Sequence, residues 1–250
     1  MRDPWALVWG LRGAAVLGVL GVWEWAGRAP INFAFPTATA TMRAFADLVG
    51  SGALPRAFGI SAQSFLLGYG AAVVFGVPFG LLMGLVRPLG RVARVYLDLL
   101  ITMPMAALVP LVILTMGVRI TSSALIVFIF SMPFVATNAY GGVRDVHGQL
   151  YEMARAFNAR WSQTLRMVVF PSALPMVLAG MRYGLSRAFI GLVIAELLLA
   201  PFGIGRLIVD ARSVFAFDRM FAAVLSVILA ALLLLSGLQQ AEARLLHWRR

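Results

Sequence analysis

The residues best spaced to act together surround the segment Glu152–Pro171, and the chemistry they offer is docking. One helical face, spaced i, i+3, i+4, i+7, carries Leu150, Met153, Ala154 and Phe157. The same spacing restarts after Asn158 with Trp161, Leu165, Val168 and Val169. Two short helices are therefore expected to meet at Asn158, which can occupy the left-handed region or cap the second helix. A folded polar wedge between two long apolar segments indicates a partner that grips it.

Charged side chains lie on the same two helices, so the predicted docking surface combines apolar and ionic contacts. The first helix is expected to be packed by Met153, Ala154 and Phe157, with both of its ends fixed so that it can transmit force. The residues assigned to the docking surface are Leu150, Glu152, Met153, Ala154, Arg155, Phe157, Asn158, Ala159 and Arg160.

Catalytic chemistry finds little support in the sequence. There is no H-E-x-x-H, no G-x-S-x-G and no pair of carboxylates at helical spacing. All 21 basic residues are arginine, so the chain lacks the lysine that a phosphate-binding loop extends to ATP. We therefore expect no catalytic residue and no cofactor in this chain. If ATP drives the protein, another subunit must bind the ATP and its Mg²⁺.

Metal and nucleic-acid chemistry are equally poorly supported. The chain has no cysteine, which excludes disulfides and thiolate metal sites, and its two histidines, His147 and His247, lie in separate polar segments. The net charge of +11 fits arginines that meet anionic lipid head groups at the edges of membrane spans. We expect membrane lipid as a partner and no nucleic acid, because no soluble basic domain is present to bind one.

The elements that must position these residues are membrane helices. Hydrophobic residues make up 61% of the chain and charged residues only 12%, a composition outside the range of soluble domains. About 20 apolar residues cross the hydrocarbon as a helix. We predict an all-α membrane protein, one transmembrane domain over residues 1–250, with a helix pair at 148–170 between spans four and five. The six predicted spans are 9–26, 65–86, 97–117, 122–141, 176–200 and 220–238. The first is too long for the apolar core of a signal peptide and is expected to stay uncleaved.

Arginine placement sets the expected orientation. With Arg2 inside, twelve arginines lie on inner segments and seven on outer segments. The positive-inside rule then places both termini, and the wedge at Glu152–Pro171, in the cytoplasm of a membrane protein with several spans.

Polar residues inside the spans are candidates for a substrate path. The candidates are Met103, Asn138, Arg187 and Glu196. Pro104 and Pro110 are expected to kink the third span, either beside a cavity or for packing. For Asn138 a hydrogen bond to a neighbouring helix is the favoured interpretation. Glu196 must be paired or face water, and it is out of phase with Arg187 for pairing along one helix face.

The two arginines of the fifth predicted span have two possible roles. Arg182 and Arg187 could draw an anion through a pore, or they could mark the inner boundary of a long, tilted span, which we favour. The glycines between Gly68 and Gly84 are expected to allow close packing of helices within lipid.

The wedge resembles the cytoplasmic coupling motif of bacterial ABC-importer permeases. That motif reads Glu-Ala-Ala, three residues, Gly, nine residues, Ile-x-Leu-Pro. Its positions fall without a gap on Glu152, Ala154, Asn158, Val168, Phe170 and Pro171. Met153 and Asn158 depart from the pattern, and Asn is the residue that reaches positive φ most readily after Gly.

The resemblance extends from about Trp23 to the C-terminus. The segments that look like permeases of nitrate, sulfonate and taurine importers are WEWAGR, FPTATATMRAF, LVRPLGRV, TNAYGGVRDV, PSALPMVLAGMRYGLSRAFIGLVIAE and FGIGRLI. The resemblance implies a homodimer in the inner membrane, two cytoplasmic ABC ATPase subunits docked on the wedges, and an extracytoplasmic substrate-binding protein. It further implies passage of a small solute, expected to be a sulfonate-like, taurine-like or nitrate-like anion.

Two other classes stand as alternatives. An ion-coupled secondary transporter would normally carry ionisable residues near the membrane midplane in repeated halves, and only Glu196 is a candidate here. A membrane-embedded enzyme would need a catalytic cluster that the sequence lacks.

Overall fold

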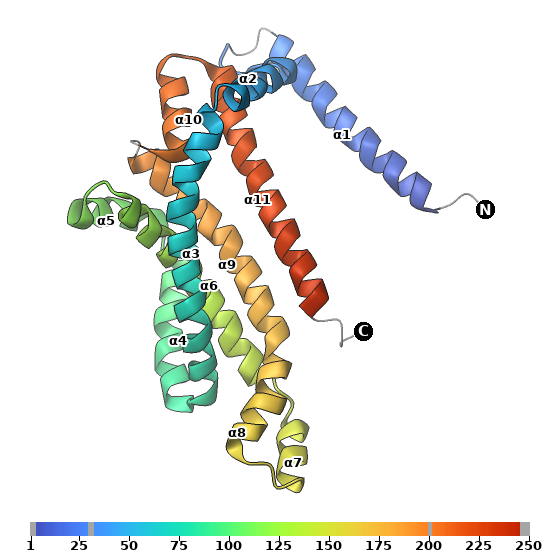
Figure 1. Ribbon diagram of the computed structural model, residues 1–250, viewed down its shortest axis with the longest axis vertical. Helices are drawn as coiled ribbons and strands as arrows, with labels where there is room; N and C mark the ends of the chain where they lie inside the picture. The colour runs from blue at the N-terminus through green and yellow to red at the C-terminus, as the bar shows by residue number, and fades with distance from the viewer. Residues whose placement is uncertain (1–3, 30–32, 200–201, 246–250) are drawn as a thin grey trace.

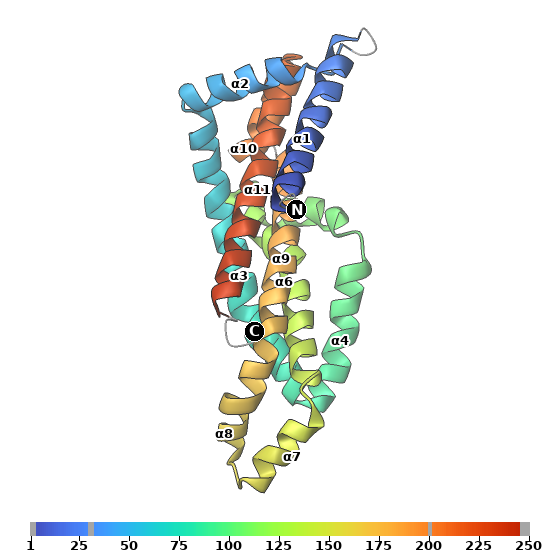
Figure 2. The ribbon, with the colours of Figure 1, turned by 90° about the vertical axis from the view of Figure 1, so that its right-hand side faces the viewer.

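The chain folds as an elongated array of helices in the computed structural model, which describes residues 4–29, 33–199 and 202–245 (Figures 1 and 2). The elements are α1 Pro4–Arg28, α2 Ala38–Gly50, α3 Ala53–Leu85, α4 Arg87–Thr102, η1 Met105–Ala107, α5 Leu108–Met116, α6 Ile120–Arg144, α7 Gly148–Ala156, α8 Trp161–Thr164, η2 Leu165–Val169, α9 Phe170–Leu199, α10 Gly203–Ser213 and α11 Phe217–Leu245. The last residue of the fifth predicted span, Ala200, lies outside the described residues, as do Arg2, His247, Arg249 and Arg250. The helical fold predicted from composition is confirmed.

Not every one of the six predicted spans is matched, within the described residues, by a helix long and apolar enough to cross a membrane. Within the described residues, four helical segments are long and apolar enough to cross a membrane, namely α3, α6, Trp161–Leu198 and α11. A fifth is reached if the bent pair α4 and Met105–Met116 counts as one span. The first predicted span, 9–26, lies within α1, a helix of 25 residues.

The third predicted span, 97–117, is not one kinked helix. Helix α4 already begins at Arg87, and the chain bends by 83° between α4 and Met105–Met116. Met103 precedes Pro104 and leaves the helical region, with ψ at 149°, because a proline ring disfavours helical geometry in the residue before it. Pro110 causes no kink. It lies in the first turn of α5, where a missing N–H breaks no helical hydrogen bond.

Helix α6 is the centre of the core, packed between α3 and α9. On α3, a Cβ atom added at Gly68, Gly80 or Gly84 would collide with α6 at Ala124, Ala136 or Val143 respectively. On α9, an added Cβ at Gly180 or Gly191 would collide with Asn138 or Phe130 of α6. Small residues thus let the three backbones approach closely. Within lipid there is no hydrophobic driving force between helices, so their association depends on this close packing. The close packing predicted from the glycines of α3 is confirmed.

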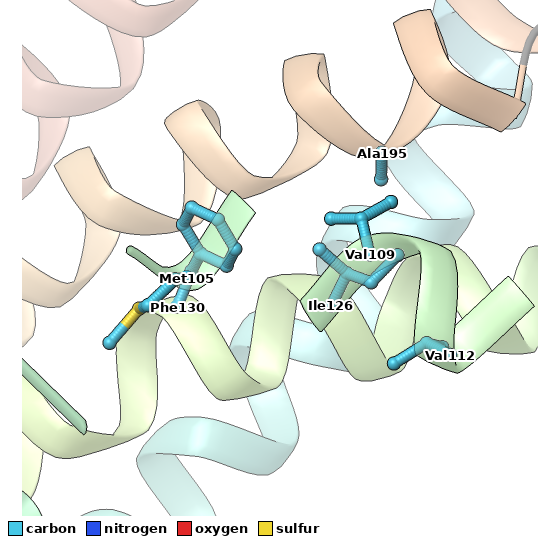
Figure 3. Packing of buried hydrophobic residues seen from close by; sticks show 6 residues of the cluster. All are labelled: Met105, Val109, Val112, Ile126, Phe130 and Ala195. Atoms are coloured by element: carbon cyan, nitrogen blue, oxygen red, sulfur yellow. The ribbon is translucent and has the colours of Figure 1, made fainter. Parts of the chain in front are cut away.

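The bent helix α5 is held against this core by an apolar cluster. Figure 3 shows that the cluster joins α5 and the turn before it to α6 and α9, with Val109 beside Ile126 and Ala195 facing them. Its buried members are Met105, Val109, Val112, Ile126, Phe130 and Ala195. The break at Pro104 therefore redirects the chain onto α6 instead of leaving a free loop.

Helix α10 is fixed to the core by its N-terminus. The first N–H groups of a helix have no partner within that helix. Here the N–H of Gly205 donates to Glu196 Oε2 at 2.9 Å, and the N–H of Ile204 donates to Ser61 Oγ at 3.0 Å. Glu196 is only 2% exposed, so α9, through Glu196, and α3, through Ser61, both hold the end of α10.

Helix α1 leaves the core after a single contact region. Trp23 Nε1 donates to the carbonyl of Pro36 at 3.1 Å, and its ring lies 6.4 Å from that of Phe221 in α11. The rest of α1 extends away from the other helices (Figure 1). Its apolar side chains are exposed, as at Leu17 and Val19, so this surface is available to lipid or to another protein chain.

The anchoring of α10 gives a stability prediction. Glu196→Ala should destabilise the folded chain by about 1–3 kcal/mol, because the buried N–H of Gly205 loses its acceptor. Glu196→Gln keeps an oxygen acceptor and should lose less. The matched control is Asp210→Ala, which removes an exposed ion pair with Arg206 (3.2 Å) and should cost under about 1 kcal/mol. Thermal unfolding in detergent measures all three variants. Melting of Glu196→Ala at the wild-type temperature would contradict the role assigned to Glu196.

Candidate functional site

The wedge predicted from the sequence is present at one end of the molecule. Helices α7 and α8 extend beyond α3, α6 and α9 there, whereas α2 and α10 lie at the opposite end (Figure 2). The turn between α7 and α8 has the hydrogen bonds of a Schellman motif. The N–H of Asn158 donates to the Arg155 carbonyl and the N–H of Ala159 donates to the Ala154 carbonyl, both at 2.9 Å. Asn158 has φ of 51°. The left-handed conformation expected for it is confirmed.

The second helix of the wedge is capped by its own residues. Arg160, and not Asn158, precedes the first helical residue of α8. Gln163 Oε1 accepts from the N–H of Arg160 at 2.8 Å, and Thr164 Oγ1 donates to the Arg160 carbonyl at 3.3 Å. Both ends of the turn are thus fixed by local hydrogen bonds, and the wedge has a defined shape without its partner.

A π-helical turn joins the wedge to the membrane core. It covers Leu165–Val169, and the N–H of Phe170 bonds to the Leu165 carbonyl, five residues back. Pro171 has no N–H to offer the Met167 carbonyl, and its ring would crowd that carbonyl in a regular α-helix. The helix nevertheless continues from α8 into α9. Sequence reasoning missed the π turn, although Pro171 near the start of a long helix is the signal for it.

Several large apolar side chains of the wedge are exposed. Phe157 is 80% exposed and Trp161 61%, whereas Ala154 is only 5% exposed. Of the three residues expected to pack the first helix, Ala154 is buried within the chain, whereas Met153 and Phe157 are exposed. Helical periodicity identifies an apolar face but does not say what covers it. An exposed aromatic and apolar ridge of this kind is typical of a protein-interaction surface.

Other side chains attach the wedge to the core. Tyr151 and Leu165 pack on a cluster formed by Val143, Val169 and Ala173. Leu150 and Ala159 are half-buried, while Glu152, Arg155 and Arg160 are exposed. One face of the wedge therefore holds to α6 and α9, and the other presents apolar and charged groups outward.

The residues predicted for a substrate path do not meet at one place. Arg187 of α9 lies over the ring of Phe134 of α6, with its guanidinium carbon 4.6 Å from the ring centroid. Asn138 lies one turn further along α6 and donates to the Phe134 carbonyl at 2.8 Å. The hydrogen bond seen for Asn138 is thus with its own helix and not with a neighbour. Met103 lies at the break after α4. Glu196 lies near the end of α9, where it binds the first turn of α10.

Several polar contacts between helices were missed by sequence reasoning. Arg182 of α9 pairs with Glu242 of α11 at 3.1 Å, in a partly buried position. Tyr69 Oη of α3 donates to the Met181 carbonyl of α9 at 2.8 Å. Both join residues far apart in the sequence, and local spacing carries no signal for such pairs. Arg182 is therefore committed to a contact between helices, while Arg187 has a stacking partner but no ion pair among the described residues.

Known proteins similar to this chain are membrane components of transport systems. Residues 76–246 match the family model described as "Binding-protein-dependent transport system inner membrane component". A putative aliphatic sulfonates transport permease of Bacillus subtilis is 31% identical over 237 residues, 92% of this chain and 84% of that protein. The taurine transport system permease of Escherichia coli is 32% identical over 188 residues, 75% of this chain and 68% of that protein.

A solved structure shares the fold at low sequence identity. It is described as an amino acid ABC transporter with histidines, and it is 20% identical to this chain. The TM-score is 0.63, and the match covers 80% of this chain and 98% of the other.

The turn of the wedge yields a prediction about Asn158. Asn158→Gly should leave the stability of the wedge unchanged or slightly higher, because glycine adopts positive φ without a side-chain clash. Asn158→Val should cost roughly 1–2 kcal/mol, the penalty for a bulky side chain in the left-handed region. Hydrogen exchange of the amides of α7 and α8 measures the difference. Equal protection in the glycine and valine variants would show that the turn does not depend on this conformation.

Proposed function

The chain belongs to the binding-protein-dependent transport system inner membrane component family, and from this premise we propose how it receives force and passes its solute. It is the transmembrane permease subunit of an ATP-driven ABC importer, a multi-pass membrane protein and not an enzyme. ATP and Mg²⁺ belong to partner ATPase subunits. The proposal concerns the coupling surface, the assembly and the chemistry of the solute.

The coupling surface is the outward face of α7, the turn at Asn158 and α8. The single observation that carries this proposal is the exposure of Phe157 and Trp161 on a wedge whose shape is fixed by its own hydrogen bonds. Exposed aromatics in a rigid frame bind a partner without a large cost of ordering. The proposed contact residues are Leu150, Glu152, Met153, Ala154, Arg155, Phe157, Asn158, Ala159 and Arg160.

Movement of the wedge would reach the membrane through one helical body. Trp161–Leu198 forms one continuous helical segment of 38 residues, and α9 packs along α6 over much of its length. At its far end Glu196 holds the start of α10. An ATPase that pulls on the wedge would therefore move α9 and α10 together, and alternating access would follow as a rigid-body movement.

The proposed assembly is a homodimer of this chain with two cytoplasmic ABC ATPases and an extracytoplasmic substrate-binding protein. In this arrangement the chain has six spans, with α1 as the first and the bent pair α4 and α5 as the third. Both termini and the wedge lie in the cytoplasm. Exposed apolar side chains along α1 and α11, such as Leu17 and Leu233, support contact with lipid or with the second copy.

The proposed solute is a small anion of the sulfonate class. Relatives with 31% and 32% identity are named for transport of aliphatic sulfonates and of taurine. Within this chain, Arg187 supplies a positive charge, and stacking on Phe134 holds the guanidinium at 4.6 Å from the ring centroid. A guanidinium matches the oxygen geometry of such an anion. Arg187, Asn138 and Met103 are therefore proposed to border the path.

The coupling proposal is tested by Phe157→Ala. Because Phe157 is 80% exposed, its loss should change the stability of the isolated chain by no more than about 0.5 kcal/mol. Loss of an aromatic anchor should weaken ATPase binding by about 2 kcal/mol or more, roughly thirty-fold. Co-purification of the ATPase and uptake by the assembled importer are the measurements.

A matched control distinguishes docking from general surface effects. Phe215 has a similar exposure of 70%. Its own φ is positive, at 56°, and it follows α10 at the opposite end of the molecule. Phe215→Ala should keep normal ATPase binding, whereas Glu152→Lys should weaken it because the charge on α7 reverses. Normal ATPase association in Phe157→Ala would mean that the wedge is not the coupling surface.

The solute proposal is tested at Arg187. Arg187→Gln should lower uptake of a sulfonate by roughly ten-fold or more, since a hydrogen bond to a charged group contributes about 1.5–3 kcal/mol. Arg187→Lys keeps the charge and should retain part of the uptake. The measurement is transport of radiolabelled taurine by vesicles that contain permease, ATPase and binding protein, with ATPase association as the folding control. Unchanged uptake in the glutamine variant would remove Arg187 from the path.

A further inference from the structure

A small cavity surrounded by arginines lies where α3, α4 and α6 meet at the wedge end of the molecule. Its volume is about 260 Å³, and it is lined by Met83, Arg87, Arg91, Tyr140 and Arg144. Arg87 and Arg91 are one helical turn apart and share a face of α4. Arg144 is the last residue of α6. Three arginines therefore line one cavity, together with a tyrosine whose phenol can donate a hydrogen bond.

No ion pair within the part of the chain that the structure describes balances this charge. Among the described residues, Arg87, Arg91 and Arg144 take part in no ion pair, whereas Arg94, the next arginine of α4, pairs with Asp98 at 3.5 Å. Glu152 lines a neighbouring cavity of about 530 Å³, which Arg87 and Arg144 border as well, but Arg155 borders that cavity too. Like charges brought together without a counter-ion repel one another, so a bound anion would stabilise the cluster.

We propose that Arg87, Arg91 and Arg144, with Tyr140, form a binding site for a tetrahedral oxyanion. The planar fork of arginine donates two hydrogen bonds at once to the oxygens of a phosphate or sulfate group. Met83 supplies an apolar wall on the α3 side. The site is distinct from Arg187, which lies on α9 beside Phe134. It does not depend on which solute the importer carries.

The favoured source of the oxyanion is the phosphodiester head group of an anionic lipid. Helix α4 carries exposed apolar side chains next to its arginines, at Val92, Val95 and Leu99. Acyl chains can lie along that face while the head group reaches Arg91 at the end of the helix. Basic pockets between membrane helices bind anionic head groups in this manner. A free inorganic oxyanion is the other source of the same chemistry.

Occupancy of the site would also bear on the wedge. Arg87 and Arg144 line both the oxyanion cavity and the neighbouring cavity, which is bordered by Tyr151 and Trp161 of the wedge. An anion between the three arginines would hold the ends of α4 and α6 together and so brace the surface on which α7 rests.

The test compares the full chain in nanodiscs of phosphatidylcholine with and without phosphatidylglycerol. Native mass spectrometry counts retained phosphatidylglycerol, and titration of inorganic sulfate into phosphatidylcholine nanodiscs tests the soluble source. Arg91→Gln should weaken retention of the anionic lipid roughly five-fold, since each arginine at a membrane surface contributes about that factor. Arg91→Lys should retain more binding than Arg91→Gln. The matched control Arg94→Gln, one turn further on the same helix, should change retention less than about two-fold.

Each outcome decides one point. Selective loss of phosphatidylglycerol in Arg91→Gln supports the site with lipid as its source. Binding of sulfate that Arg91→Gln abolishes, without lipid selectivity, supports the site with a soluble anion as its source. If neither anion binds, or if Arg94→Gln loses as much as Arg91→Gln, then the arginines form a diffuse basic surface and the proposal is overturned.

Discussion

The close contact of α3 and α9 with α6 is the interaction on which the rest of the structure depends. Within hydrocarbon the backbone groups must be satisfied inside each helix, and association then relies on packing. Glycines at 68, 80 and 84 of α3, and at 180 and 191 of α9, allow the backbones to approach until a single added Cβ would collide. Interiors packed this tightly transmit displacement instead of absorbing it. Helices α4, α5, α10 and α11 pack directly on these three helices, whereas α1 contacts Pro36 and, in α11, Phe221.

Helix α9 is attached to a different element at each of its two ends, and so it links the two ends of the molecule. At one end α9 continues through the π turn Leu165–Val169 into the wedge. At the other, Glu196 binds the N-terminus of α10, which Ser61 of α3 also contacts. A permease subunit has to convert a movement on one side of the membrane into a movement on the other. A rigid helix anchored at both ends supplies that link without any chemistry in this chain.

Patterns in the sequence revealed the parts of this structure that depend on local physics. Composition predicted the membrane helices, the spacing around Asn158 predicted two helices joined by a left-handed turn, and the glycines of α3 predicted close packing. The bend at Pro104 was larger than a kink, because proline acts on Met103 as well as on its own turn. The exposure of Phe157 could not be predicted, since periodicity marks an apolar face whether a core or a partner covers it. The pairing of Arg182 with Glu242 and the binding of Glu196 to α10 join distant segments, which no local pattern reveals.

The central claim, that the wedge faces the cytoplasm and is covered there by an ATPase, can be measured directly because the chain has no cysteine. Ser162 is exposed on α8, so Ser162→Cys offers a single thiol for an impermeant maleimide. The account predicts labelling in inside-out vesicles, no labelling in right-side-out vesicles, and protection when the ATPase is bound. Labelling from the outer side, or labelling that bound ATPase leaves unchanged, would contradict it.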